Sequence, residues 1–193
     1  MIRDAIAESR LFFTADTHFG SMRHLELSKR PFDSVEEMDD AIVDNWNAKV
    51  PEDGLVIHQG DFGDLGVLDR LNGNILLLPG NYDHTVEFLD GMMPWQSCEK
   101  MLMLAGMRYS ITTGAMMEHS SGLQLTHEPS NADWTIDEFV LYAHCHCQKF
   151  KRGGVNVGVD CHHFRPLSLD EVLFWSTAVM VFYDEEVFHP GRS

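Results

Sequence analysis

Short apolar runs along this chain are repeatedly followed by aspartate, asparagine or histidine. Asp16 and His18 follow the apolar run 11–15, and Asp61 follows the predicted strand 55–59. An apolar run that ends in polar residues is typical of a buried strand leading into a loop. In open α/β sheets, ligands bind outside the carboxyl ends of such strands. Further polar residues stand at predicted strand ends in the same way: Asn81, His127, His144 and His146.

These side chains have the chemistry of a metal site with mixed oxygen and nitrogen ligands. Asp16 and His18 are two residues apart, as are His144 and His146, so each pair can point to one side of an extended backbone. A single aspartate at a strand end is usually a cap or turn residue, and a single histidine is more often structural than a ligand. It is the whole set, in this order, that indicates a metal centre.

The first half of the chain alternates between predicted strands and helices. Segment 34–49 carries apolar residues at helical spacing, and Ser34 with Glu37 forms a capping box at its start. A short helix is expected over 67–71, before a turn at 72–73. This alternation indicates an α/β layered domain. The runs predicted as strands are 11–15, 55–59 and 75–78.

The second half is richer in predicted strands. Ser168 is expected to cap a helix over 169–175, and a last strand is predicted over 179–183. A chain of 193 residues is long enough for one domain with a core, and we expect a single domain over 1–193. The other strand candidates of this half are 101–112, 123–126, 139–143 and 155–159.

Composition and charge narrow the class of function. No run is long enough to cross a bilayer, and the first residues do not resemble a secretory signal, so we expect a cytoplasmic protein with no membrane partner. The four cysteines lack a redox or zinc spacing and are expected to be free and mostly buried thiols in a reducing compartment. The net charge of −16 disfavours long nucleic acids, which bind clustered Lys and Arg. A small phosphorylated substrate is compatible with this charge, because bound cations dominate the local field.

The order of the polar blocks resembles the calcineurin-like metallophosphoesterase superfamily. The segments 30–32 and 156–160 are similar to those of the compact single-domain phosphoesterases of bacteria and their phages. The resemblance implies an α/β fold, a four-layer α/β/β/α sandwich in which both sheets deliver ligands to one edge. The blocks that carry it extend through nearly the whole chain: Asp16-x-His18, Gly60-Asp61, Gly80-Asn81-x-Asp83, His127 and His144-x-His146.

The same resemblance implies a two-metal hydrolytic site. In such sites two ions ~3.5–4 Å apart share a water, lower its pKa and place it in line with the scissile P–O bond, so that a bridging hydroxide attacks. The ligand types favour Mn²⁺, with Fe or Zn²⁺ as alternatives. The first ion would be held by Asp16, His18, Asp61 and His146, and the second by the bridging Asp61 with Asn81, His127 and His144.

The chain departs from the family's Gly-Asn-His-Asp block at Tyr82, where a proton-donating or phosphate-binding histidine is usual. A phenol, with a reference pKa of about 10, is a weak acid at neutral pH. Family members without this histidine are often phosphodiesterases. The substitution therefore favours a diesterase for a small nucleotide-like phosphodiester, of which a 2′,3′-cyclic nucleotide is one case.

Two residues beside Tyr82 are also considered. Asp83 would orient a neighbour, and His84 is an alternative to the missing histidine, although its place beyond Asp83 favours a loop residue. The expected catalytic residues are Asp61, Asn81, Tyr82 and Asp83.

Several other polar residues lie near the predicted ligands in sequence. Ser21 stands where close relatives often carry a further histidine, and the nearby Arg23 and His24 are expected in a solvated loop. His58 is expected to pack behind Asp61 and orient the ligands. A basic cluster after His146 is predicted to form a hairpin that either grips a phosphate or is a solvated turn: Lys149, Lys151 and Arg152.

Other functions would fit the same motif order. A phosphomonoesterase is one alternative, and a nuclease of the kind found in recombination proteins is another, although the acidic charge argues against a nuclease. A non-catalytic scaffold on this fold is a third, but such proteins typically lose metal ligands, which this chain retains. Exposed apolar edges on so small a sandwich would allow a homodimer.

Overall fold

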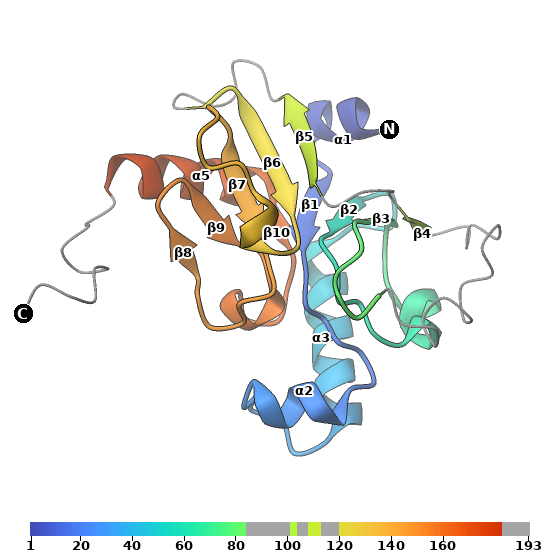
Figure 1. Ribbon diagram of the computed structural model, residues 1–193. Helices are drawn as coiled ribbons and strands as arrows, with labels where there is room; N and C mark the ends of the chain where they lie inside the picture. The colour runs from blue at the N-terminus through green and yellow to red at the C-terminus, as the bar shows by residue number, and fades with distance from the viewer. Residues whose placement is uncertain (84–100, 104–107, 113–119, 183–193) are drawn as a thin grey trace, which may run out of the picture.

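The computed structural model describes residues 1–83, 101–103, 108–112 and 120–182. It has a mixed α/β fold with two five-stranded sheets (Figure 1). In the first sheet, the neighbouring strands β1, β2, β3 and β4 are all parallel, and β10 pairs antiparallel with β1. The carboxyl ends of β1, β2 and β3 therefore meet at one edge. The bounds are β1 Leu11–Thr14, β2 Leu55–His58, β3 Asn74–Leu77, β4 Met101–Met103 and β10 Leu167–Ser168.

The second sheet has the order β5-β6-β7-β9-β8. Strands β6, β7 and β9 are parallel, with β5 and β8 antiparallel at the two edges. A parallel bridge between Ala15 and Gly158 joins the end of β1 to the segment after β9, so the ligand-bearing edges of the two sheets meet. The bounds are β5 Arg108–Thr112, β6 Gly122–Thr126, β7 Phe139–Tyr142, β8 Phe150–Lys151 and β9 Gly154–Asn156.

Alternate residues of β1 point into two separate cores, as expected for a strand that is buried on both faces. Phe12 packs with the helix α3, which covers the outer face of the first sheet. Leu11 and Phe13 pack between the two sheets, together with residues of β6, β7 and α5. The helices and 3₁₀ helices are α1 Ile2–Ala7, α2 Met22–Leu27, α3 Val35–Lys49, η1 Leu65–Arg70, η3 Pro129–Asn131, η4 Val159–Cys161 and α5 Leu169–Val181.

The predicted helix at 34–49 is confirmed as α3. The Ser34 side chain accepts a hydrogen bond from the Glu37 backbone N–H at 3.1 Å. The Glu37 carboxylate accepts from the backbone of Asp33, one residue before the predicted partner. The short helix expected over 67–71 is the 3₁₀ helix η1. Gly73, with φ +83°, takes the left-handed conformation that its predicted turn requires.

The strand predicted over 179–183 is wrong, because α5 continues to Val181. Ser168 and Glu171 form a capping box that starts this helix, as the sequence indicates. Leu169, Val172 and Val179 lie at helical spacing and are all buried. Val179 therefore belongs to the buried face of this helix and does not start a strand. Tyr183 lies outside the described residues.

The predicted strand 101–112 is in fact two strands that belong to different sheets, β4 in the first and β5 in the second. The predicted strand 155–159 is shorter than expected, because β9 ends at Asn156 and η4 begins at Val159. Cys145, Cys147 and Cys161 are free thiols, as predicted, but Cys147 is exposed and the other two are only partly buried, so the expected burial is wrong for these three; Cys98 lies outside the described residues. In the part of the chain that the structure describes, no helix is long and apolar enough to cross a membrane.

Candidate metal centre

Four of the predicted ligands have an unusual backbone conformation. Asp16, His18, Asp61 and His144 have φ of 54°, 48°, 57° and 67°, in the left-handed region that residues other than glycine rarely adopt. Each such residue costs of order 1–3 kcal/mol, and such residues cluster at functional sites. The loops after β1, β2 and β7 therefore hold these side chains in strained positions that the surrounding structure must stabilise.

Two glycines allow the loops after β2 and β3 to approach each other closely. Gly60 has φ +93°, and a Cβ atom there would lie 2.3 Å from the backbone nitrogen of Gly80. A Cβ atom on Gly80 would lie 2.3 Å from Oδ1 of Asp61 and 2.8 Å from Cε1 of His127. Only glycine fits at either position, which explains the Gly60-Asp61 and Gly80-Asn81 blocks in physical terms.

Asp16, His18 and His146 form the first half of the candidate centre. One ligand atom from each of these three side chains lies within 4.8 Å of the other two. Asp16 Oδ1 and His18 Nε2 are buried and have no hydrogen-bond partner in the protein. Because a buried polar atom without a partner is costly, these two atoms fit a site whose remaining bonds are supplied by a ligand. The other oxygen of Asp16 accepts a hydrogen bond of 3.0 Å from the backbone N–H of His144.

Asp61, His127 and His144 form the second half, again with ligand atoms within 4.8 Å of one another. Asn81 belongs to the same group, because its Oδ1 lies 3.0 Å from His127 Nε2 and 3.0 Å from His144 Nδ1. His127 donates from Nδ1 to the backbone carbonyl of Gln59 at 2.8 Å, which leaves Nε2 to face the site. His127 is buried, whereas His144 is exposed.

Asp61 lies between the two halves. Its Oδ2 is 3.3 Å from His127 Nε2 in the second half and 3.7 Å from His18 Nε2 in the first. Its other oxygen accepts a hydrogen bond of 2.9 Å from the backbone N–H of Tyr82. The structure thus brings all seven predicted ligands into two adjoining groups, with Asp61 in the position of a shared ligand.

Burial and charge shift the pKa values of these ligands in both directions. Burial raises the pKa of Asp16 to about 6, although His127 and His146 oppose it. Burial lowers the pKa of His18 far below its ordinary value, so this ring is neutral at pH 7. Burial would also lower the pKa of His127, but the hydrogen bond to Asp61 and the charges of Asp16 and Asp61 outweigh it and raise the pKa to about 9. Opposite shifts within one cluster are typical of functional sites.

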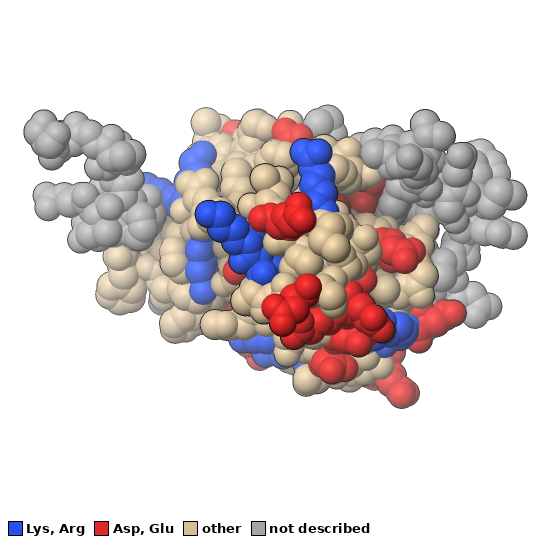
Figure 2. Space-filling view, turned by 90° about the horizontal axis from the view of Figure 1, so that it is seen from below, with Lys and Arg blue, Asp and Glu red and all other residues tan. Residues whose placement is uncertain are grey.

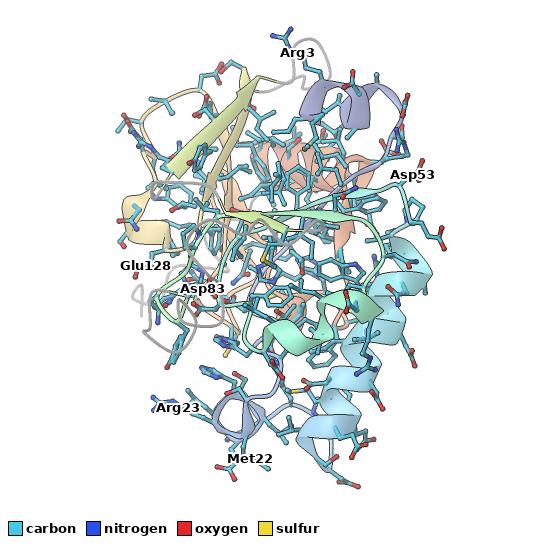
Figure 3. The ribbon with its side chains drawn as sticks, turned by 90° about the vertical axis from the view of Figure 1, so that its right-hand side faces the viewer. Arg3, Met22, Arg23, Asp53, Asp83 and Glu128 are labelled. Atoms are coloured by element: carbon cyan, nitrogen blue, oxygen red, sulfur yellow. The ribbon has the colours of Figure 1, made fainter. Side chains whose placement is uncertain are left out.

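Asp83 supports the loops instead of joining the ligands. It is fully buried, and its carboxylate accepts hydrogen bonds from the backbone N–H groups of Asp61, Phe62 and Gly80 at 2.7, 3.0 and 2.8 Å. These bonds tie the loop after β2 to the loop after β3. In Figure 3, Asp83 and Glu128 lie on the flank of the molecule where these loops meet the loop after β6.

His58 packs beside the same loops, as predicted. Its Nε2 lies 3.0 Å from the hydroxyl of Thr17, the residue between Asp16 and His18, and that hydroxyl donates to the carbonyl of Phe62. Burial lowers the pKa of His58 to about 3, so the ring is neutral. His58 therefore connects the loop after β1 to the loop after β2.

The expectation that His24 lies in a solvated loop is wrong. His24 is only 3% exposed, and its ring stacks on His18 with centroids 3.4 Å apart. Its Nδ1 lies 2.8 Å from the hydroxyl of Ser21, the N-cap of α2. Arg23, in contrast, is exposed, as expected, but it lies in the helix α2 and not in a loop, and it projects from that helix (Figure 3). The short helix α2 turns His24 inward, which its sequence position alone did not indicate.

Tyr82 lies at the rim of the first half. It is 36% exposed, and its ring meets His18 and His24 edge-on at centroid distances of 5.4 and 4.8 Å. The structure therefore places a phenol beside the ligands at the position where the resemblance leads one to expect histidine. His84 lies outside the described residues.

The basic cluster forms the predicted hairpin, from β8 and β9. The ammonium group of Lys149 lies 4.9 Å from the centre of the Trp175 ring, and that of Lys151 lies 3.9 Å from the Trp134 ring. Arg152 is exposed. These contacts with aromatic rings give the phosphate-binding interpretation no support. Seen from below, Lys and Arg gather on one side of the face and most Asp and Glu on the other (Figure 2).

Two residues behind the first half, Arg30 and Asp160, were not predicted as site residues. The carboxylate of Asp160 accepts a hydrogen bond of 2.7 Å from His146 Nδ1. Arg30 donates two hydrogen bonds of 2.8 Å to the same carboxylate. Burial would raise the pKa of Asp160, but the bonds from His146 and Arg30 outweigh it and lower the pKa. Both residues lie in the two segments that carry the resemblance, 30–32 and 156–160.

Comparisons with known proteins give the fold but no activity. No protein-family model matches the chain. The uncharacterized protein MJ1445 of Methanocaldococcus jannaschii is 25% identical over 181 residues, covering 85% of this chain and 89% of that protein. The crystal structure of the protein of unknown function AQ665 from Aquifex aeolicus is similar with a TM-score of 0.59 and 20% identity, over 84% of this chain and 96% of that one. The chain therefore shares its α/β fold with this solved protein.

Proposed function

We propose that this chain is a two-metal phosphodiesterase of the calcineurin-like metallophosphoesterase type, with the four-layer sandwich of that superfamily. The observation that carries the proposal is the arrangement of the ligands. Two adjoining three-residue groups meet at Asp61, which belongs to the second group, and the first group contains two buried ligand atoms without a protein partner. Imidazoles, carboxylates and one amide suit a divalent cation of intermediate hardness, and Mn²⁺ is our choice among Mn²⁺, Fe and Zn²⁺.

Each residue would have a role that follows from its position. Bound cations would supply an activated water and neutralise charge on the phosphoryl oxygens. Asp61 would hold the two halves at a fixed separation, and Asp83 would keep its loop in place through three backbone hydrogen bonds. The chemistry therefore depends mainly on positioning and electrostatics.

Tyr82 supports a diester as the substrate. Its phenol is 36% exposed and can hydrogen-bond an oxygen of the substrate, and it stands where the resemblance leads one to expect a proton-donating histidine. Without a strong acid at this position, substrates with good leaving groups are hydrolysed best. The net charge of −16 supports a small substrate, such as a 2′,3′-cyclic nucleotide, over a long nucleic acid.

The proposal is tested with the metal-free protein and two chromogenic esters, bis(p-nitrophenyl) phosphate and p-nitrophenyl phosphate. We expect turnover only after Mn²⁺ is added, and a preference for the diester. A panel of 2′,3′-cyclic nucleotides then defines the substrate. A preference for the monoester would favour a phosphomonoesterase, and salt-sensitive cleavage of duplex DNA would favour a nuclease. Binding of Mn²⁺ without any turnover would favour the scaffold.

A further inference from the structure

Arg30 is buried beneath the first half of the candidate centre. Its side chain is fully buried, and it hydrogen-bonds Asp160, the loop after β1 and the sulfur of Met38 in α3. Besides Asp160, it donates 2.8 Å and 2.6 Å hydrogen bonds to the backbone carbonyls of Thr17 and Asp16. These carbonyls belong to the loop whose ligands, Asp16 and His18, have positive φ. Arg30 is therefore placed to stabilise the strained backbone that carries two of the three ligands of this half.

Asp160 extends the same network to the third ligand. It accepts from His146 at Nδ1, so the other ring nitrogen, Nε2, is the one free to bind a metal. The hydroxyl of Ser28 also lies 3.2 Å from His146 Nδ1. Arg30 and Asp160 thus support all three ligands of the first half. Arg30 bonds the backbone of Asp16 and of Thr17, the neighbour of His18, and Asp160 bonds the side chain of His146.

The second half has a different kind of support. His127 donates from Nδ1 to the neutral carbonyl of Gln59 and not to a separate carboxylate. His144 is exposed, and its Nδ1 faces Asn81, which is itself a candidate ligand. The ligand atoms of this half bond to one another, so they are satisfied without a cation. Two of the first-half atoms have no such alternative.

We propose that Arg30 and Asp160 are positioning residues that make the Asp16, His18 and His146 half the tighter of two metal sites. This inference rests on the proposed function, because it assumes that both halves bind a divalent cation. A charged partner behind a ligating histidine fixes its tautomer and orientation, and its loss typically weakens metal binding about 10–100-fold. The second half lacks this support and binds its cation later.

The test is calorimetric titration of the metal-free protein with Mn²⁺, for the wild type and for Asp160→Asn and Arg30→Lys. We expect two binding steps in the wild type. Each substitution should weaken the tighter step about 10–100-fold and leave the weaker step nearly unchanged. The electron paramagnetic resonance spectrum of Mn²⁺ at one equivalent should change in both variants, because the geometry around the ion changes.

Glu171→Gln is the matched control. Glu171 is also a carboxylate that binds two cationic side chains, Arg165 and Lys49, but at the start of α5. Its loss should leave both Mn²⁺ steps unchanged. Circular dichroism and thermal unfolding report whether each variant is folded.

The outcomes separate this inference from the proposed function. A wild type that binds no Mn²⁺ would overturn the metal centre itself. Two-step binding that is unchanged in folded Asp160→Asn, or weakened equally at both steps, would overturn only the positioning role. If both variants fail to fold while the control folds, Arg30 and Asp160 serve the fold, and the inference is also wrong.

Discussion

The first half of the candidate centre is mostly buried, with a buried arginine behind it, whereas the second half is more open and satisfies its own ligand atoms. Asp16 and His18 leave two buried atoms without partners, and a buried Arg30–Asp160 pair stands behind them. In the second half, Asn81, His127 and His144 bond to one another, and His144 is exposed. If both halves bind a cation, as proposed, the first is preorganised for it and the second must rearrange to accept one.

The largest effect is expected at the residue that the two halves share. Asp61→Asn should lower diester hydrolysis by about 10³-fold or more, because metal catalysis supplies several kcal/mol of stabilisation in the transition state. The matched control is Asp64→Asn, an exposed carboxylate that caps η1. Initial rates with bis(p-nitrophenyl) phosphate measure both. Equal rates for folded Asp61→Asn and the wild type would remove the link between the two halves.

Removing one histidine from each half should separate the two sites. We expect His146→Ala to abolish the tighter Mn²⁺ step and His144→Ala the weaker one, each by more than about 100-fold in affinity, since a direct ligand matters more than its support. Metal analysis after gel filtration should find about one Mn²⁺ in each variant. Retention of the same Mn²⁺ affinity by both variants would contradict the division into halves.

Metal removal should lower thermal stability in two stages. A ligand at 100 times its Kd stabilises the folded state by about 2.7 kcal/mol, which corresponds to roughly 5–11 °C in Tm for a domain of this size. The larger part of this shift should appear with the first equivalent of Mn²⁺, because the first half relieves its unpaired buried atoms. Differential scanning calorimetry during stepwise addition of Mn²⁺ measures the shift. An equal shift per equivalent would mean that the halves are alike.

The smallest effect is expected from Glu171, which lies outside both halves. Burial would raise the pKa of Glu171, but Arg165, the backbone of Ser168 and Lys49 lower it to about 2. A carboxyl group whose pKa is lowered on folding stabilises the protein above its ordinary pKa, and this contribution is lost as pH falls from about 4.5 towards 2. Glu171→Gln should therefore cost at most about 1 kcal/mol near neutral pH.

The thermal unfolding of wild type and Glu171→Gln, compared between pH 7 and pH 2.5, checks this expectation. The difference in Tm should shrink with falling pH and should not depend on Mn²⁺. A difference that depends on Mn²⁺ would mean that α5 is coupled to the metal centre, so that the two halves are not its only determinants.

The positions of the candidate ligands could be predicted because each one follows directly from a local sequence pattern. An apolar run, a glycine or a tight turn, and then a polar residue indicate a strand end, as at Gly60-Asp61. Their grouping follows from parallel strands whose carboxyl ends meet. The helix α3 could be predicted equally well, because its N-cap residue and the spacing of its apolar residues both indicate a helix that starts after Ser34.

The support behind the ligands could not be predicted in the same way. Arg30 and Asp160 are 130 residues apart, and no local pattern connects them. His24 is buried because α2 folds it against His18, a tertiary contact that its loop-like sequence did not reveal. The valines at the end of α5 favour a strand locally, but burial of one helical face overrides that preference. The residues that support the candidate ligands are placed by contacts across the chain, whereas each candidate ligand can be recognised from the local pattern at a strand end.

The most direct test of the two-metal account is diester hydrolysis measured while Mn²⁺ is added to the metal-free protein in sub-stoichiometric steps. We expect little turnover of bis(p-nitrophenyl) phosphate up to one equivalent, when only the Asp16, His18 and His146 half is filled. Turnover should then rise steeply as the second half binds. Full activity at one equivalent, or no activity at any concentration of Mn²⁺ although both sites are occupied, would contradict it.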